Sequence, residues 1–296
     1  MHEYKMNGCI PPMITPFKED GSLDVANLEK LVDFLSENVH GVFINGSYGC
    51  GALMSVEERK KVAEITKKTA NGRIDVIVQV GTTSNRQSAE LAAHAESIGA
   101  QAVAAVGPYY YQHNEDSVLY FFEDIIKAAP NTPVYVYNNP KFQGYPMSVK
   151  LIERLHGIGV HGIKDATFDI MAHATYHRLL GSKGFDVVLG TEAMWLAACV
   201  LGTKAFIPGL ANAFPEIVRK MYEEGIAGEY EKCRETLFKV NEMREIMYLA
   251  KSTQLAVYAM LEIRGIITAY PRAPFISATK EQKDSIRKAL IELKAL

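Results

Sequence analysis

A lysine ends a short apolar run in Val160-His161-Gly162-Ile163-Lys164-Asp165. Such a run between loop residues indicates a buried strand, whose alternate residues face the same side. Withdrawing an ammonium group from water is costly unless it is paired or loses its proton. A desolvated lysine amine attacks carbonyl carbon, so Lys164 is predicted to be a Schiff-base nucleophile. The alternative is a lysine whose stem reaches from the strand end to water.

A tyrosine ends the preceding apolar run, Val134–Tyr137. Tyr137 is in phase with Tyr135, whereas Val134 and Val136 face the other side of the strand. A phenol beside an amine can move the protons that carbinolamine formation, dehydration and carbon–carbon cleavage require. Tyr137 is therefore the candidate acid and base. The alternative is a core tyrosine whose hydroxyl is satisfied by a neighbour.

A glycine-rich loop, Gly46–Gly51, matches neither of the nucleotide-binding patterns GxGxxG and GxxxxGK[ST]. Its backbone N–H groups and the hydroxyl of Ser47 would suit a small anion such as a carboxylate. From the loop alone, a plain tight turn is the preferred interpretation. Gly190 and Gly209 likewise either leave room for a substrate or only turn the chain.

These residues lie where short β-branched runs end, and helical stretches separate the runs. The predicted strands are Cys9–Ile14, Gly41–Asn45, Ile74–Val80, Ala102–Val106, Val134–Tyr137, Val160–Lys164, Val187–Leu189 and Ala205–Ile207. The predicted helices are Asp24–Asn38, Val56–Thr69, Asn85–Ile98, Ser117–Ala128, Ser148–Leu155, Ile170–Leu180, Glu192–Leu201 and Phe214–Glu224. Eight such alternations are typical of a (β/α)8 TIM barrel, here residues 1–224. A doubly wound sheet is the alternative, but Pro11 and Pro12 stand where its glycine fingerprint would begin.

Beyond Glu224 the strand signals stop, and three further helices are predicted over Ala227–Ala250, Thr253–Ile263 and Thr279–Leu293. We interpret residues 225–296 as a C-terminal helical extension packed on the barrel. In such a barrel the active site lies at the carboxyl ends of the strands. Lys164 and Tyr137 end two of the predicted strands, and the tyrosine run Tyr109-Tyr110-Tyr111 follows another. This run is expected to line the mouth or to form a subunit contact.

Composition narrows the class of protein. The chain has 296 residues with a net charge of -2 and no basic run, so nucleic acid and anionic membranes are poor partners. It has no signal-type segment and no apolar window long enough for a membrane span. Its four cysteines show neither CxxC spacing nor the density of a disulfide framework. A reduced, cytoplasmic enzyme fits best.

A metal site is the competing chemistry. Asp169, His173 and His177 fall at i, i+4 and i+8 of a predicted helix, a spacing that places possible ligands on one face. That helix is expected on the outside of the barrel, so we interpret the row as a solvated face. No metal and no organic cofactor is predicted.

Taken together, the motifs resemble the dihydrodipicolinate synthase/N-acetylneuraminate lyase family of class I aldolases. They are Ile10-Pro11-Pro12-Met13-Ile14-Thr15-Pro16-Phe17, the Gly46-Ser47-x-Gly49 loop, Pro108-Tyr109-Tyr110, Tyr137-Asn138-x-Pro140 and Gly162-Ile163-Lys164-Asp165. The resemblance implies a homotetramer in which Lys164 forms a Schiff base with pyruvate or another 2-keto acid. It implies Tyr137 as acid and base, and Tyr110 as a tyrosine that reaches a neighbouring subunit's site. Ser47 and the backbone of Tyr48 would bind the carboxylate, and Gly190 and Ile207 would line the pocket.

The chain departs from the family pattern at several positions. Tyr48 and Cys50 replace a threonine and a glutamate of the loop, and the threonine hydroxyl usually relays protons between the two tyrosines. Tyr48 either substitutes its own hydroxyl or fills the pocket. Phe142 stands where dihydrodipicolinate synthases carry a carboxylate-binding arginine. Thr191 and Ala166 replace an acidic residue and a threonine that sialate lyases use for the sugar chain.

The predicted function is reversible aldol cleavage or condensation by a lyase that releases pyruvate, as in a 2-keto-3-deoxy sugar acid aldolase. Three alternatives stay open within the family. One is dihydrodipicolinate synthase proper, which condenses pyruvate with aspartate semialdehyde. Another is a hydratase-aldolase or dehydratase acting on a less polar 2-keto acid, because Tyr48 and Phe142 predict a less polar mouth. The third is a non-catalytic member that only binds keto acids, and outside the family a metal-dependent class II aldolase remains.

Overall fold

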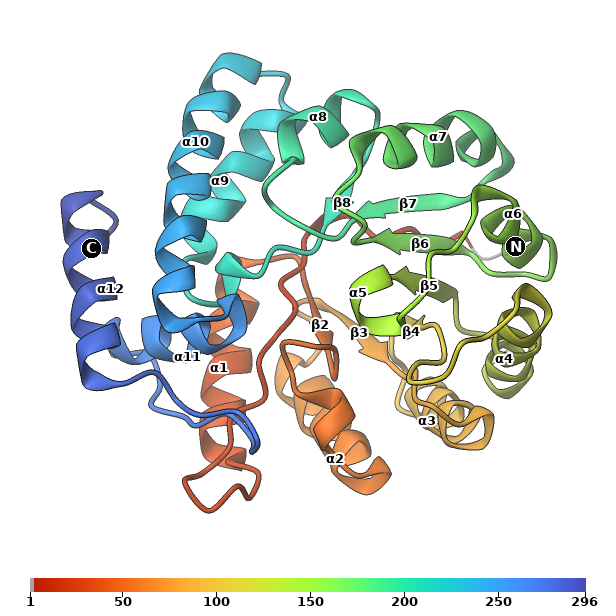
Figure 1. Cartoon of the computed structure of the whole chain (residues 1–296), viewed down its shortest axis with the longest axis horizontal. Helices are drawn as coiled ribbons and strands as arrows, with labels where there is room; N and C mark the ends of the chain where they lie inside the picture. Colours follow the sequence, from red (N-terminus) through yellow and green to blue (C-terminus); the bar gives the residue numbers. More distant parts are fainter. Residues whose placement is uncertain (1–2) are drawn as a thin grey trace.

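The computed structural model describes residues 3–296 and contains a single eight-stranded parallel sheet that curls into a barrel (Figure 1). Its strands are β1 (Gly8–Cys9), β2 (Gly41–Ile44), β3 (Asp75–Gln79), β4 (Ala102–Val106), β5 (Val134–Asn138), β6 (Gly162–Asp165), β7 (Asp186–Leu189) and β8 (Ala205–Phe206). The order β1-β8-β7-β6-β5-β4-β3-β2 leaves β1 and β2 at the seam. A parallel bridge between Pro12 and Phe43 joins them there. The predicted (β/α)8 barrel is confirmed.

The first strand is shorter than the predicted Cys9–Ile14, because only Gly8–Cys9 pairs regularly with β8. Proline has no N–H group for a ladder hydrogen bond, and two prolines follow directly. The chain then switches partners: the N–H of Phe43 donates to Pro11 O, and the N–H of Met13 donates to Phe43 O. This switch closes the barrel.

Helices surround the strands, as Figure 1 shows. They are α1 (Val25–Asn38), α2 (Val56–Ala70), α3 (Asn85–Ser97), α4 (Glu115–Ala128), α5 (Pro140–Gln143), α6 (Val149–Gly157), α7 (Ile170–Leu180), α8 (Trp195–Val200) and α9 (Pro215–Ile226). Capping explains several starts: Asp24 and Ser148 accept backbone N–H groups, and Ser55 with Glu58 forms a capping box. Ser84 precedes α3 without a side-chain cap.

Three helices follow the barrel along one side of the molecule, in blue in Figure 1: α10 (Tyr230–Met247), α11 (Thr253–Ile263) and α12 (Lys280–Glu292). α10 packs against α8 and α9, and α11 packs against α10 and α12. The hydroxyl of Tyr258 donates to Thr15 O at 2.8 Å, and Arg272 pairs with Glu58 at 2.8 Å. The extension is therefore tied to the barrel, and a division of the chain at residue 225 stays a prediction.

The two faces of the strands bury different side chains. Tyr135, Tyr137 and Val188 belong to a cluster inside the barrel, whereas Val134 and Val136 belong to the larger core between strands and helices. The predicted phase of β5 is therefore confirmed. Among residues 3–296, no helix combines the length and apolarity that crossing a membrane requires.

Candidate active site

The amine of Lys164 lies inside the mouth of the barrel, and only 3% of the residue is exposed. Its Nζ atom lies 3.9 Å from the centre of the Phe43 ring and 3.7 Å from the centre of the Tyr137 ring. Burial lowers the pKa of Lys164 well below its usual range, and no carboxylate among the described residues opposes this shift. The alternative of a lysine that reaches to water is excluded by this burial.

Tyr137 lies beside Lys164 because the two residues are register partners on β5 and β6. Its hydroxyl lies 3.4 Å from Ser47 Oγ and accepts a hydrogen bond from Asn139 Nδ2 at 3.3 Å. Burial raises the pKa of Tyr137, and these two hydrogen bonds offset part of that rise. An amine whose pKa is lowered and a phenol whose pKa is raised thus share one desolvated site.

The next residue, Asp165, points the other way, as its alternation on β6 predicts. It pairs with His173 Nδ1 at 2.9 Å in the layer between strands and helices. That histidine is fully buried, and its other ring nitrogen contacts Thr203 Oγ1 at 2.8 Å, as does His177 Nε2. The prediction of a solvated face is therefore wrong for His173 and His177, which are buried and partly buried, whereas Asp169 is exposed and caps α7. A buried carboxylate needs a partner, and α7 turns His173 inward to supply it. No cluster with metal-binding composition occurs within residues 3–296.

Tyr48 does not reach Tyr137 with its hydroxyl. The hydroxyl donates instead to Thr253 Oγ1 on α11 at 2.8 Å, and Gln254 Nε2 donates to the Tyr48 carbonyl at 3.2 Å. Gly209 leaves the space for it, since a side chain at that position would overlap the Tyr48 hydroxyl. Of the two expectations for this residue, the structure shows the second: Tyr48 fills part of the pocket.

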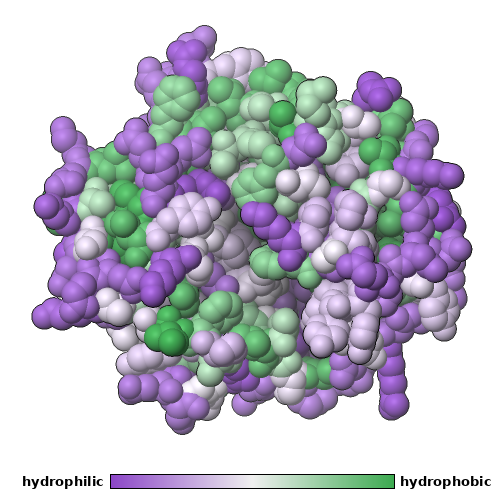
Figure 2. Space-filling view, in the orientation of Figure 1, coloured by the Kyte–Doolittle hydropathy of each residue, from purple (hydrophilic) through white to green (hydrophobic). Residues whose placement is uncertain are grey.

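A cavity of about 210 Å³ opens over Lys164 at the carboxyl ends of the strands. Ser47, Tyr48, Gly190 and Ile207 all line it together with Tyr137, so these predicted site residues converge. Gly190 is required by packing as well, because a Cβ there would lie 2.6 Å from the carbonyl oxygen of Asp165. In the space-filling view, the most hydrophilic residues are concentrated around the edge of this face, and less hydrophilic ones predominate towards its centre (Figure 2).

The far side of this cavity is polar. Glu192 is buried and accepts hydrogen bonds from the N–H groups of Gly209 and Leu210. Arg244 of α10 pairs with the same carboxylate at 3.0 Å. The remaining polar lining comes from Asn139, Lys141, Thr191, Tyr248 and Thr253.

A second, apolar chamber of about 300 Å³ adjoins the first. The two share Ser47, Tyr137 and Phe142 as a common wall. Its other apolar walls are Leu53, Val106, Tyr109, Pro274 and Phe275. Tyr110, by contrast, lines neither space: it is 84% exposed, with a positive φ of 81°.

Comparison with known proteins decides the family. A profile described as the dihydrodipicolinate synthetase family matches residues 5–293. The chain belongs to this family. It is 29% identical to 4-hydroxy-tetrahydrodipicolinate synthase of Archaeoglobus fulgidus, over 98% of this chain and 99% of that protein. It is also 29% identical to N-acetylneuraminate lyase of Mediterraneibacter gnavus, over 96% of this chain and 91% of that protein.

The fold agrees with this assignment. The wild-type sialic acid aldolase of Ruminococcus gnavus superposes with a TM-score of 0.93 at 27% identity, over 99% of this chain and 98% of that one. This member of the dihydrodipicolinate synthetase family is thus an enzyme, a lyase of the class I aldolase type. The named relatives include both synthases and lyases, so membership alone leaves the acceptor open.

Several residues that line the cavity were not predicted as contacts of it, among them Asn139, Glu192, Arg244, Tyr248 and Thr253. Asn139 and Glu192 carried a signal, because each lies just after the end of a predicted strand. Arg244, Tyr248 and Thr253 carried none, because a polar residue on a helix normally indicates the face towards water.

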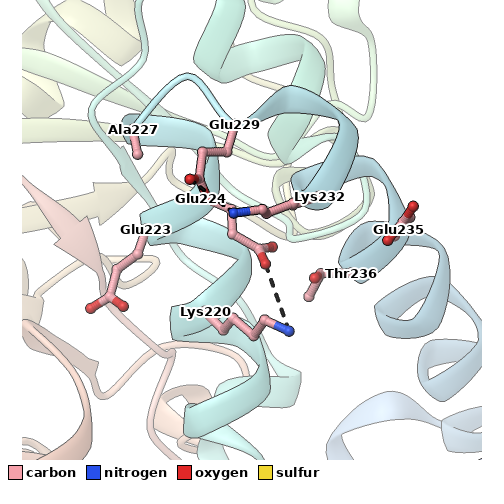
Figure 3. Close-up of a pocket in the computed structure, with 8 residues that line it drawn as sticks. All are labelled: Lys220, Glu223, Glu224, Ala227, Glu229, Lys232, Glu235 and Thr236. Carbon is pink, nitrogen blue, oxygen red and sulfur yellow. Dashed lines mark hydrogen bonds and ion pairs between the residues drawn. The ribbon is translucent and has the colours of Figure 1, made fainter.

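A larger hollow between α9 and α10 shares no lining residue with the family site. Figure 3 shows its charged walls, in which Lys220 faces Glu224 and Lys232 pairs with Glu229 at 3.0 Å. Four of its eight lining residues are glutamates and two are lysines, so opposite charges are interspersed. This composition indicates a solvated surface, not a second catalytic centre.

Proposed function

We propose that Lys164 forms a Schiff base with pyruvate or a related 2-keto acid, and that the enzyme catalyses reversible aldol cleavage of a 2-keto-3-deoxy sugar acid. One observation carries the proposal. The buried amine of Lys164 lies 3.7 Å from the ring centre of Tyr137, with no carboxylate among the described residues to hold its proton. Attack on a ketone requires the neutral form of the amine, which the lowered pKa of Lys164 favours.

In this mechanism the amine adds to the keto carbon, and Tyr137 protonates the departing hydroxyl so that water leaves and an iminium remains. Tyr137 then takes the proton of the C4 hydroxyl while the C3–C4 bond breaks. The iminium accepts the electron pair as an enamine, which is protonated at C3 and hydrolysed to pyruvate. The protonated imine is itself the electron sink, so neither metal nor organic cofactor enters these steps.

The substrate carboxylate would lie against Ser47 and the backbone N–H of Tyr48, with Gly190 and Ile207 as walls. Lining of the same cavity by all four residues supports this placement. Beyond the keto acid, the cavity continues towards Thr191, Glu192 and Arg244. Such donors and acceptors suit the hydroxyl groups of a sugar chain.

Two alternative activities can be compared with the proposed sugar-acid aldolase. Dihydrodipicolinate synthase proper is disfavoured, because Phe142 offers no charge for a second carboxylate. A hydratase-aldolase for a less polar 2-keto acid is favoured by one observation, the apolar chamber behind Phe142 and Tyr137. A panel of acceptor aldehydes distinguishes the proposed sugar-acid aldolase from the hydratase-aldolase. The sugar-acid aldolase requires polyhydroxylated acceptors, whereas the hydratase-aldolase requires aromatic or aliphatic ones.

We also propose a homotetramer in which Tyr110 completes a neighbour's site. The exposed side chains of Tyr110 and Tyr111, whose rings contact edge to face at 5.0 Å, support a contact at this loop. Size measurement in solution tests the assembly. Mixing Lys164→Met and Tyr110→Phe subunits tests whether activity is recovered across an interface.

The decisive experiment is reduction of the enzyme with borohydride in the presence of pyruvate, followed by peptide mapping. We expect one added pyruvyl group, at Lys164. Intact protein without added mass at that residue would contradict the proposal. An adduct without turnover on any acceptor would identify a non-catalytic keto-acid-binding member, and activity lost to chelators would indicate a class II aldolase.

A further inference from the structure

Asn139 begins α5 directly after β5 and occupies the variable position of the Tyr137-Asn138-x-Pro140 motif. The residue is buried, with 8% of its surface exposed, and it lines the Lys164 cavity. Its backbone N–H donates to Gln143 Oε1, so the residue is held at both its main chain and its side chain.

The hydrogen bonds around Asn139 fix which way its amide group points. The backbone N–H of Lys141 is a donor, so the side-chain atom that it contacts at 3.2 Å must be the oxygen, Oδ1. The amino group, Nδ2, therefore faces the hydroxyl of Tyr137, at 3.3 Å. An amino group only donates, so the phenol oxygen accepts this hydrogen bond.

This direction decides where the phenol proton lies. Because Asn139 occupies an acceptor position of the Tyr137 oxygen, the phenol O–H is free to point at Ser47 Oγ, 3.4 Å away. When the proton leaves, the amino group of Asn139 remains as a donor to the phenolate. Donation to the charged form of a group favours that form.

Neither Tyr48 nor Tyr110 of this chain forms a hydrogen bond with the Tyr137 hydroxyl. Tyr48 stands where the family resemblance expects a relay threonine, but its hydroxyl is bonded to Thr253. Tyr110 is on the surface of this chain. Ser47 and Asn139 are the two hydrogen-bond partners of the Tyr137 hydroxyl within residues 3–296.

We propose that Asn139 is a positioning residue that aims the Tyr137 proton at Ser47 and holds the phenolate, in place of the relay that position 48 does not provide. The inference deepens the proposed function and depends on it for the identity of the reaction. During dehydration the phenol gives its proton to the departing hydroxyl, the C–O bond breaks, and water leaves. The resulting phenolate keeps the Asn139 hydrogen bond until it takes the next proton.

Two substitutions test this role without removing the start of α5. Asn139→Asp and Asn139→Ser both keep a side-chain oxygen that can cap the helix, as Asn139 does for Lys141. Both lose the amino donor, and only the aspartate adds a negative charge. Asn114→Asp, at the exposed cap of α4, is the matched control for a new carboxylate at a helix start.

The first measurement needs no substrate. Tyrosine labelled with 13C at Cζ reports each phenol's titration by NMR, and Tyr137→Phe assigns the signal. We expect the Tyr137 titration to move up by about one pH unit in Asn139→Ser and further in Asn139→Asp. A purely structural role for Asn139 predicts no movement, and an unchanged titration in both variants overturns the proposal.

The second measurement is exchange of the pyruvate methyl protons with D2O at saturating pyruvate, where Lys164 is already in the imine. The ascending limb of its pH profile is expected to move with the NMR titration. At a fixed pH on that limb, the exchange rate should fall about tenfold for each pH unit by which the limb moves up. Absence of exchange and of a Lys164 adduct in the unmodified enzyme would refute the Schiff-base function. In that case the NMR titration would still show whether Asn139 stabilises the Tyr137 phenolate.

Discussion

Asp186 and Lys164 are both buried inside the barrel, Asp186 near its amino-terminal end and Lys164 near its mouth. Asp186 accepts hydrogen bonds from the Tyr135 hydroxyl at 2.7 Å and from the Met6 N–H at 2.9 Å. Lys164 faces the rings of Phe43 and Tyr137 instead. Both side chains are buried to a similar degree, but among the described residues only the carboxyl group of Asp186 has hydrogen-bond partners.

The difference separates a structural group from a chemical one. Burial without a partner favours the neutral form of an amine, and a neutral amine is reactive. Burial raises the pKa of Asp186 as well, but the hydrogen bonds from the Tyr135 hydroxyl and the Met6 N–H offset part of that rise and occupy the carboxyl group. The two tyrosines of β5 that point into the barrel show the same difference. Tyr135 donates a hydrogen bond to Asp186, whereas Tyr137 lies against the amine of Lys164.

Lys164→Met is expected to have the largest effect on activity of the variants that test this difference. The nucleophile is removed, so turnover should fall by roughly three or more orders of magnitude, and borohydride should no longer fix pyruvate. The apolar replacement also removes a desolvated amine, so the free energy of unfolding should stay the same or rise. Steady-state kinetics and urea denaturation measure the two effects, and a large loss of stability would show that the lysine holds the fold.

The same variant gives a pH signature. The pKa of Lys164 in the folded protein lies below its unfolded value of about 10.4. Between these two values the unfolded chain binds a proton that the folded chain does not, so the stability of the unmodified enzyme rises with pH there. This lysine adds up to about 1.4 kcal/mol per pH unit to the slope, and Lys164→Met should lack that part. Parallel stability profiles for the two proteins would contradict the lowered pKa.

Removing one hydroxyl from each β5 tyrosine sharpens the contrast. Tyr135→Phe leaves the Asp186 carboxylate short of a donor and should lower the free energy of unfolding by about 2 kcal/mol. Tyr137→Phe should leave stability within about 1 kcal/mol but slow turnover by roughly 10²–10⁴-fold. Each variant is the other's control in paired denaturation and rate measurements. Equal effects of both changes on activity would remove the distinction between the two ends of the barrel.

The same residues show which features of the fold and the site could be predicted from the sequence. Strands buried on both faces read as apolar runs, so the barrel and the inward phase of Tyr137 and Lys164 were predictable. The partners of a buried group were not, because they come from distant segments. The partner of Asp165 is His173, whose helix was expected to turn that face to water. Periodicity locates a polar face but does not say what it faces.

The C-terminal helices show the same limit. Arg244 and Thr253 lie in segments predicted as helices, yet nothing local indicates that their side chains reach the cavity. The structural role of Tyr48 depends on both the hydroxyl of Thr253 and the absence of a side chain at Gly209. Only the assembled barrel brings these three residues together.

Thr253→Val is expected to have the smallest effect. It tests whether the Tyr48 hydroxyl is a structural group, like Asp186, or takes part in the chemistry, like Lys164. The substitution keeps the volume and the Ser252 cap of α11 but removes the acceptor of the Tyr48 hydroxyl. If that hydroxyl resembles Asp186 in being buried and satisfied, the free energy of unfolding should fall by about 1 kcal/mol and Thr253→Ser should restore it. Pyruvate should still be trapped at Lys164, because the amine and the Tyr137 hydroxyl keep their surroundings. Loss of trapping in the valine variant, with recovery in the serine variant, would instead place the Tyr48 hydroxyl among the groups that move protons.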